Sequence, residues 1–243
     1  MKRLRRMATW LLALGLAGLG ALLLYGYARA HPEDLPWTAL DLARPPGAFT
    51  GRKLADLADE GGRCLALLDA AGVRFTALPP RAAGPQCGYE SAVRFAGGGA
   101  LRIGYRPADL GTNCAVAAAL ALWEWHVVQP AALRHFGSEV ATIEHFGSYS
   151  CRRLYGRGEG AWSEHARANA VDVAAFTLAD GTRISVVGDW TEEGARGRFL
   201  REVRDGACGL FATVLSPDYN AAHRDHLHLD QAGRGAFGWR GCR

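Results

Sequence analysis

Two short segments carry residue types whose spacing is typical of metal ligands. The first contains His165 and Asp172, and the second contains His226 and His228 in a His-x-His pattern. Side chains alternate along a strand, so the two histidines of the second segment would share one face, with leucines on the other. Two imidazoles side by side in front of an apolar layer are costly without a partner, and a metal ion is the usual partner.

A carboxylate is expected to complete this group. If the segment around Asp172 is also a strand, its side chain can meet the histidines across the sheet, while His165 reaches in from the preceding loop. Two imidazoles and one carboxylate form the three-ligand set of a catalytic zinc site, with one position left open. A metal lowers the pKa of water held there toward about 7. Taken alone, the His-x-His pattern also fits two histidines on the surface. Asp172 alone also fits a hydrogen-bonded carboxylate at the end of a strand.

A single α+β domain over residues 49–243 is predicted to position these side chains, with flanking helices and a small antiparallel sheet that carries the metal group. Periodicity and capping signals predict helices over residues 53–71 (interrupted near 61–62), 112–128 (capped by Thr112 or Asn113), 130–137 and 192–204. Strands are expected over residues 73–78, 91–96, 100–105, 139–146, 169–176, 182–187, 211–215 and 226–230, with turns at the glycines 97–99 and at Asp180-Gly181.

Composition excludes some classes of function. The chain has 243 residues, 49% of them hydrophobic and 21% charged, which is ordinary for a globular protein. Five basic residues and no acidic ones lie in residues 1–30, which leaves 23 basic and 24 acidic residues, a net charge of −1, in residues 31–243. A nucleic-acid-binding protein needs a basic face on its folded part, so the sequence argues against nucleic acid as a partner.

The first thirty residues form an export segment. A basic start precedes residues 8–28, which carry no charge and are long enough as a helix to cross a bilayer core of about 30 Å. Positive flanks stay in the cytoplasm, which predicts a single-pass inner-membrane anchor with the C-terminal domain in the periplasm. Ala28-Arg29-Ala30 also fits a cleavage site, and a cleaved chain would be secreted to the periplasm. Residues 31–48 contain four prolines and are predicted to be a semi-extended linker.

The cysteines agree with an oxidising compartment. All six follow the export segment and none forms a Cys-x-x-Cys pair, so disulfides are favoured over a zinc knuckle or buried free thiols. Sequential pairing is the least demanding of the possible connectivities. It would join Cys64 to Cys87, Cys114 to Cys151 and Cys208 to Cys242.

The order of these motifs resembles known families. Ser-x-His, Asp172 and the later His-x-His are similar to the signature of the zinc peptidases that include D-Ala-D-Ala carboxypeptidases and murein endopeptidases, a framework shared with the hedgehog domain. With Tyr149-Ser150-Cys151-Arg152, Asp180-Gly181, residues 214–220 and the terminal Cys242-Arg243, the chain over roughly residues 60–243 more closely resembles the bacterial extensin-like C-terminal domain family. No proline-rich repeat typical of extensins is present.

The resemblance implies roles for individual residues. His165, Asp172 and His228 would bind zinc (Zn²⁺). His226, two residues before a ligand, would lie beside the metal-activated water as a base or transition-state stabiliser. Ala168 stands where the wider signature often has glycine, which matters if that turn requires a positive φ.

Two further residues are implied in catalysis. Arg152 matches an arginine of the peptidase group that holds the substrate or its developing oxyanion. Asp225 stands where some members carry a catalytic glutamate. Regular strand alternation would turn Asp225 away from His226, so His226 is the favoured helper unless the strand begins with a bulge.

These inferences predict an envelope-located zinc-dependent peptidase, of the D,D-carboxypeptidase or endopeptidase kind, that acts on the peptide stems or cross-links of peptidoglycan. Its partners would be a peptidoglycan peptide and, through the N-terminal helix, the inner membrane. Two alternatives remain open. One is a non-catalytic zinc-containing module that binds the cell wall or acts as a scaffold, and the other is a disulfide-stapled domain without metal.

Overall fold

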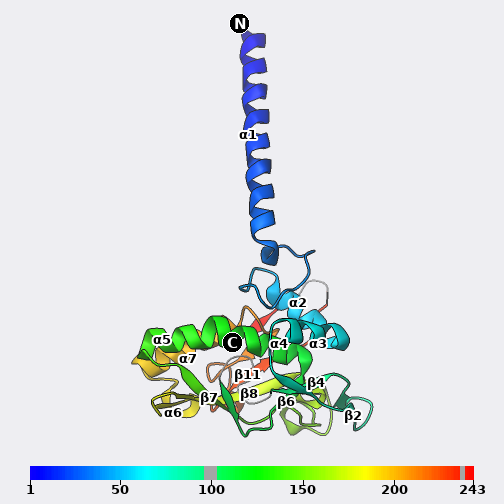
Figure 1. Ribbon diagram of the computed structural model, residues 1–243, viewed down its shortest axis with the longest axis vertical. Coiled ribbons are helices and arrows are strands. Elements are labelled where there is room, and N and C mark those ends of the chain that lie inside the picture. Colours follow the sequence, from blue (N-terminus) through cyan, green and yellow to red (C-terminus); the bar gives the residue numbers. More distant parts are fainter. Residues whose placement is uncertain (96–102, 236–238) are drawn as a thin grey trace.

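A twisted sheet forms the centre of the folded body in the structure, a computed structural model that describes residues 1–95, 103–235 and 239–243 (Figure 1). Its strands are β5 (Gly104–Arg106), β7 (Val140–His145), β8 (Ala170–Leu178), β9 (Arg183–Ser185), β10 (Thr213–Leu215), β11 (Leu227–Asp230) and β12 (Gly241–Cys242). The order is β12-β10-β11-β8-β7-β5, with β9 also paired to β8. The pairs β5–β7 and β10–β12 are parallel, so the sheet is larger and less uniform than the predicted antiparallel one.

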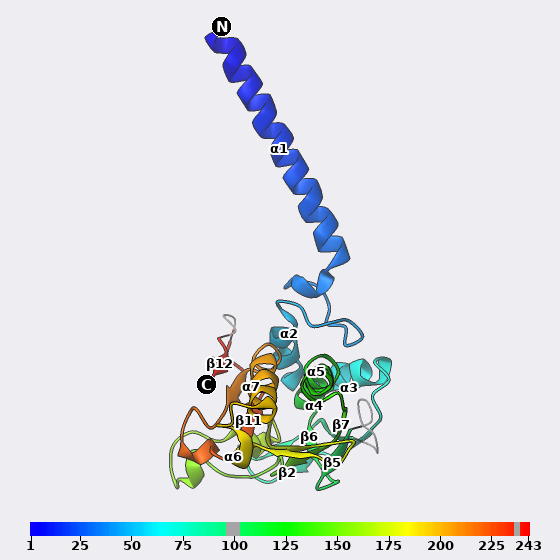
Figure 2. The same ribbon diagram turned by 90° about the vertical axis from the view of Figure 1, so that its left-hand side faces the viewer.

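Helices cover one face of this sheet. The helix α4 (Cys114–Trp123) continues through a π-helical turn (Glu124–Val128) into α5 (Gln129–Phe136), and α7 (Ala195–Ala207) packs beside α5. Figures 1 and 2 show these helices on the side of the sheet that is nearer the N-terminal helix α1 (Lys2–Ala30). The other face of the sheet is therefore left available for side chains of a site.

Capping residues set the bounds of the long helical run. Asn113 precedes α4, and its side chain accepts a hydrogen bond from the backbone N–H of Ala115. At the end of α5, Gly137 adopts a left-handed conformation with φ 65°, which glycine enters without steric cost. Both ends agree with the sequence, but the predicted division into two helices is bridged by the π-helical turn.

A smaller layer lies beside the main sheet. It contains α2 (Thr50–Asp56), the 3-10 turn η2 (Leu57–Asp59) and α3 (Gly61–Ala70), with a sheet of order β1-β4-β6 and a hairpin of β2 and β3. These strands are β1 (Phe75–Ala77), β2 (Arg81–Ala82), β3 (Gly88–Tyr89), β4 (Ala92–Phe95) and β6 (Gly111–Asn113). The short helices are η1 (Pro32–Asp34), η4 (Leu154–Gly156), η5 (Glu164–Arg167), α6 (Val186–Asp189) and η6 (Ala221–His223). The predicted glycine turn at residues 97–99 lies outside the described residues.

One hydrophobic core joins both layers, which confirms the α+β class and the single domain. Val171 and Val173 of β8 and Leu227 and Leu229 of β11 are fully buried in the layer between sheet and helices. The alternate residues of these two strands point to the opposite face. The strand alternation expected from the sequence is therefore present where the candidate ligands lie.

The N-terminal helix α1 projects from the body and has no buried residue (Figure 1). It is long and apolar enough either to cross a membrane or to be a signal sequence. The segment that follows is packed rather than semi-extended, because Leu40 and Leu42 enter the core. Lys53 Nζ also donates to Thr38 Oγ1 at 2.9 Å. Apolar side chains at alternate positions outweigh the stiffness of the prolines here.

Three disulfides are present, and they pair Cys64 with Cys114, Cys87 with Cys151 and Cys208 with Cys242. The prediction of disulfides and of the last pair is confirmed. Sequential pairing of the first four cysteines is wrong, because α3 packs directly on α4 and brings their cysteines together. Proximity in the fold, rather than in the sequence, decides the partner.

Loss of the bridge between Cys87 and Cys151 is expected to destabilise the protein. The bridge closes a separation of 64 residues, and constraint of the unfolded chain typically contributes about 2–4 kcal/mol. Replacing both cysteines with serine should lower the melting temperature. Wild-type protein in strong reductant should lose more stability because all three bridges open. An unchanged melting temperature in both samples would contradict this expectation.

Candidate metal centre

Three side-chain atoms converge at the centre of the sheet. His165 Nε2 lies 3.2 Å from Asp172 Oδ1 and 3.2 Å from His228 Nδ1, and His228 Nδ1 lies 2.9 Å from Asp172 Oδ1. A tetrahedral ion with bonds of about 2.0–2.1 Å separates its ligands by about 3.3 Å. The three atoms therefore already have the spacing that such an ion requires, and these residues form a group that could hold a metal ion.

The register of two antiparallel strands places two of these residues. His228 of β11 lies directly opposite Asp172 of β8, and residues opposite each other on one face have neighbouring side chains. His165 comes from the adjacent 3-10 turn η5. The hydroxyl of Ser163 caps η5 by accepting from the backbone N–H of His165 at 3.3 Å. Strand register and a capped turn together define the cluster.

The turn after η5 confirms the importance of position 168. Ala168 has φ 52°, a left-handed conformation that glycine adopts more easily. Its carbonyl oxygen accepts hydrogen bonds from Thr112 Oγ1 and Ser148 Oγ, both at 3.1 Å, and from the backbone N–H of Asn113 at 2.8 Å. These contacts stabilise the strained turn that carries His165 into the cluster.

Outer hydrogen bonds fix which nitrogen of each imidazole faces the centre. His165 Nδ1 donates to the carbonyl oxygen of Ser148 at 2.7 Å, so Nε2 is the nitrogen that faces the cluster. His228 Nε2 contacts Asp230 Oδ2 at 3.1 Å, which leaves Nδ1 facing the cluster. Metal-bound histidines usually have such a partner on their other nitrogen.

Burial and pairing shift the pKa values of this group. Burial opposes a positive charge on His228, but its hydrogen bonds to Asp172 and Asp230 outweigh burial and raise its pKa to about 9. Burial also acts against the charged form of Asp172, yet hydrogen bonds from His165 and His228 hold its pKa well below the ordinary value. Without metal the cluster keeps a proton on His228, and an ion that binds must displace it.

His226 and Asp225 form a pair at the edge of the cluster. His226 Nδ1 lies 2.9 Å from Asp225 Oδ1, and its Nε2 lies 3.5 Å from Asp172 Oδ1. The expectation that alternation turns Asp225 away from His226 is wrong, because β11 begins only at Leu227. The carboxylate thus orients the imidazole, whose Nε2 faces the candidate ligands.

His223, which the sequence indicates only as a possible substrate-binding or outer residue, also lies at the site. Its ring centroid lies 5.2 Å from that of His226 and 5.9 Å from that of His228. Its Nδ1 lies 2.8 Å from Asn220 Oδ1, which also accepts from the backbone N–H of Ala222. Because that oxygen is an acceptor, His223 Nδ1 carries the proton. Burial and the neighbouring imidazoles lower the pKa of His223 to about 4, so it is neutral. The position of His223, three residues before His226, is the signal in the sequence that indicates it.

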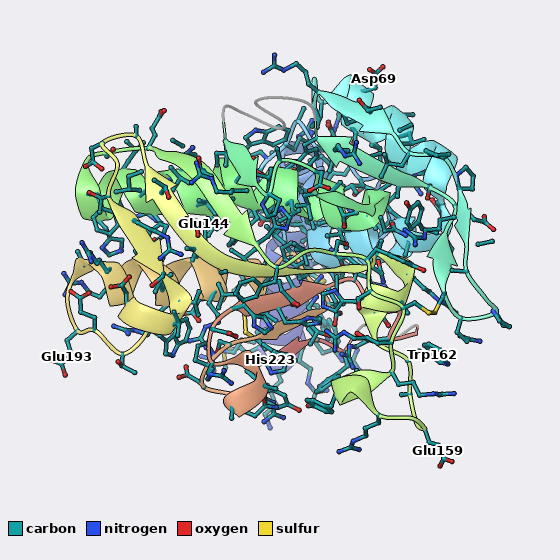
Figure 3. All side chains as sticks on the ribbon, turned by 90° about the horizontal axis from the view of Figure 1, so that it is seen from below. Asp69, Glu144, Glu159, Trp162, Glu193 and His223 are labelled. Carbon is teal, nitrogen blue, oxygen red and sulfur yellow. A yellow bond between two sulfur atoms is a disulfide. The ribbon has the colours of Figure 1, made fainter. Side chains whose placement is uncertain are left out.

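A cavity of about 120 Å³ opens onto this cluster. Arg152 lines it together with Ser163, Tyr155 and the histidines. The structure thus brings Arg152 to the same opening as the candidate ligands. Figure 3 views the body from the side opposite α1 and shows His223 below the strands of the sheet.

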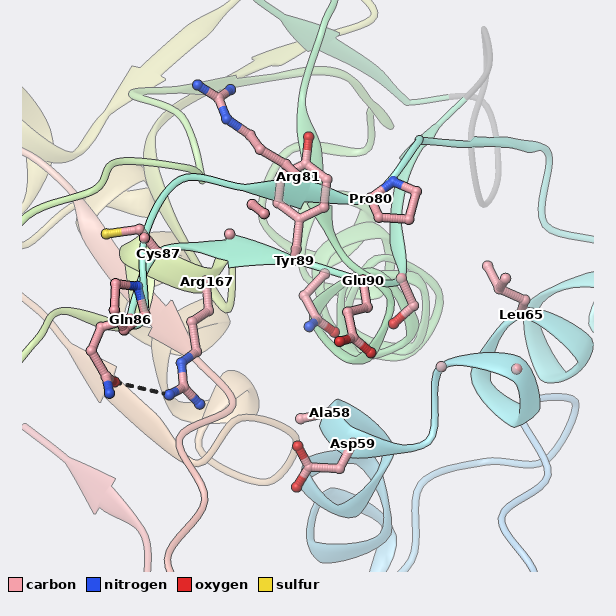
Figure 4. Close-up of a pocket in the computed structure, with 18 residues that line it drawn as sticks. Ala58, Asp59, Leu65, Pro80, Arg81, Gln86, Cys87, Tyr89, Glu90 and Arg167 are labelled. Atoms are coloured by element: carbon pink, nitrogen blue, oxygen red, sulfur yellow. Dashed lines mark hydrogen bonds between the residues drawn. The ribbon is translucent and has the colours of Figure 1, made fainter.

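A larger cavity, about 830 Å³, lies between the β2–β3 hairpin and the segment from η2 to α3. Figure 4 shows Arg81 and Tyr89 on one wall and Asp59 on the other, with Arg167 Nη2 donating to Gln86 Oε1 at 3.1 Å. No histidine is among the described residues that line it. The candidate metal ligands line the smaller cavity instead.

Comparisons with known proteins give one match. A family model described as Extensin-like protein C-terminus matches residues 62–243, a range that includes all six cysteines and every candidate site residue. No curated protein and no solved structure matches the chain.

Proposed function

The chain belongs to the extensin-like protein C-terminus family, and we propose that its folded domain is a zinc-dependent peptidase that hydrolyses the peptide stems or cross-links of peptidoglycan. The convergence of His165 Nε2, Asp172 Oδ1 and His228 Nδ1 carries this proposal. Two imidazoles and one carboxylate with an open side form the ligand set of catalytic zinc sites.

The residues around the ligands supply the other parts of a hydrolytic site. A zinc ion held there would supply Lewis acidity and lower the pKa of water. His226 is held by Asp225 with its free nitrogen toward the ligands, so it can accept a proton from water and return it to the leaving amine. Arg152 lines the opening and can donate to a carbonyl oxygen as negative charge develops on it.

The choice of substrate rests on the resemblance to the peptidoglycan peptidases and on the N-terminal helix. That helix, as a membrane anchor, would hold the domain in the periplasm beside the cell wall. The three disulfides support an oxidising compartment. The site lies on the face of the sheet that the helices leave open, where a polymer can approach.

Metal analysis followed by a digestion assay tests the proposal. The full chain, purified in detergent, should contain about one zinc ion per molecule by elemental mass spectrometry. His165→Ala should lose the ion, whereas the matched control His135→Ala, on α5, should keep it. Wild-type protein should release peptides from purified peptidoglycan, and a chelator should stop the release until zinc is restored.

The outcomes separate the alternatives. Bound zinc without peptide release would favour the non-catalytic wall-binding module. Absence of zinc after reconstitution would contradict both the peptidase and that module.

A further inference from the structure

A third cavity adjoins the candidate metal centre on the same face of the sheet. We infer that it is a subsite for a substrate side chain that carries a carboxylate on an aliphatic stem. The inference deepens the proposed function, and rests on it, by naming the chemical class of a residue next to the bond that is cut. The cavity has a volume of about 380 Å³, about three times that of the cavity over the ligands.

The cavity begins where the metal cluster ends. Ala174, which lines it, follows Asp172 by two residues on β8 and so faces the same side about 7 Å away. Phe146 also lines it, and its ring lies 5.8 Å from the ring of His226. Asp225, whose side chain is hydrogen-bonded to that of His226, lines the end of the cavity closer to the metal cluster. An extended peptide over this sheet face, with every second side chain about 7 Å apart, would place one of them here.

The walls of the cavity are largely apolar. Phe146 is 62% exposed and Val187 is 65% exposed, although both are large hydrophobic residues. Pro107 and the small side chain of Ala174 complete the apolar surface. Exposed apolar surface beside a candidate active site is typical of a ligand-binding groove. A chain of methylene groups bound there would cover this apolar surface and would itself be removed from contact with water.

One guanidinium in this lining makes no hydrogen bond or salt bridge among the described residues. Arg183 donates two hydrogen bonds to Glu144, at 2.8 and 2.7 Å, so these two charges neutralise each other. Asp225 accepts a hydrogen bond from His226 at the end of the cavity beside the metal centre. Arg106 lies opposite Glu144 across the β5–β7 pair and acts electrostatically on this carboxylate, which is already bound by Arg183. Two guanidinium groups therefore lie beside one carboxylate, and Arg106 is exposed at the rim. A guanidinium at the end of an apolar groove favours a carboxylate at the end of an aliphatic stem.

A glutamate scan tests the subsite. Each of a set of dye-labelled alanine pentapeptides would carry one glutamate, as the L or the D enantiomer, at a different position. These peptides would be titrated against the full chain in detergent after removal of metal. Glutamine at the same positions provides the matched peptides. At one position, glutamate should bind about five- to tenfold more tightly than glutamine, as a partly exposed charged hydrogen bond requires.

Variants identify the residues responsible. Arg106→Gln should abolish the preference for glutamate, whereas Arg94→Gln, an exposed arginine on β4, should leave it unchanged. Ala174→Leu should fill the groove and weaken binding of the preferred peptide more than binding of the other peptides. Equal binding of glutamate and glutamine peptides at every position, absence of binding, or a preference that survives Arg106→Gln would overturn the inference.

Hydrolysis by the zinc-loaded protein separates this inference from the proposed function. Cleavage without any preference for glutamate would support the proposed peptidase activity and contradict the subsite. A binding preference for glutamate that depends on Arg106, without cleavage of any peptide or of peptidoglycan, would support the subsite and contradict the proposed peptidase activity.

Discussion

Replacement of His226 with alanine is expected to lower peptide release by about 100- to 10,000-fold, the usual contribution of a positioned acid or base, while zinc stays bound. The His226 ring nitrogen lies 3.5 Å from Asp172 Oδ1 but outside the group of three converging atoms. Its loss therefore removes proton transfer without removing a ligand. Metal content by elemental mass spectrometry and initial rates of peptide release would be measured on the same samples.

Companion variants distinguish proton transfer from damage to the fold. Asp225→Asn keeps the shape of the side chain but removes the charge that orients His226, so it should lower the rate less than His226→Ala. His135→Ala changes a histidine that pairs with Glu202 on the helical layer and should have no effect. Full activity in His226→Ala would exclude it from the mechanism, and loss of zinc would reassign it as a ligand.

The candidate ligands could be predicted because their placement depends on local rules. Within β8 and β11, alternation alone decides which side chains face the core and which face the site. Pairing of the two strands then brings His228 opposite Asp172. The same local rules predicted the turn at Asp180-Gly181, where Gly181 has φ 88°.

Features that depend on packing between distant segments could not be predicted. The partner of Cys64 follows from the contact of α3 with α4. Arg106 and Phe146 reach the cavity next to His226 only because β5 pairs with β7 and β7 pairs with β8. Alternation also gave a wrong orientation for Asp225, since the rule holds only inside a strand and β11 begins after it. Local patterns identify residues, whereas the pairing of elements decides their neighbours.

A buried carboxyl in the helical layer gives the second large expected effect. Glu124, in the π-helical turn between α4 and α5, is fully buried, and Tyr105 donates a hydrogen bond to its Oε1. Its Oε2 has no hydrogen-bond partner among the described residues. Burial raises the pKa of Glu124 from 4.5 to about 8, although the hydrogen bond from Tyr105 acts in the opposite direction. The carboxyl is therefore neutral in the folded protein near pH 7.

The free energy of unfolding should consequently fall as pH rises from about 4.5 to about 8. Over this range the unfolded chain has lost the Glu124 proton while the folded chain retains it, so rising pH favours the unfolded state. At about 1.4 kcal/mol for each pH unit, the loss reaches about 3–4 kcal/mol at pH 7–8. Below pH 4.5 both states are protonated and the effect disappears.

Glu124→Gln should remove this dependence, because an amide keeps an oxygen for Tyr105 and has no proton to lose. The variant should melt roughly 6–12 °C above wild type at pH 8, and close to wild type at pH 4.5. Thermal unfolding of the full chain in detergent at both pH values measures the difference, with Glu193→Gln on the exposed surface as the control. An equal difference at both pH values would instead attribute the effect to packing. A variant less stable than wild type at pH 8 would mean that the carboxylate has a partner that stabilises its charge.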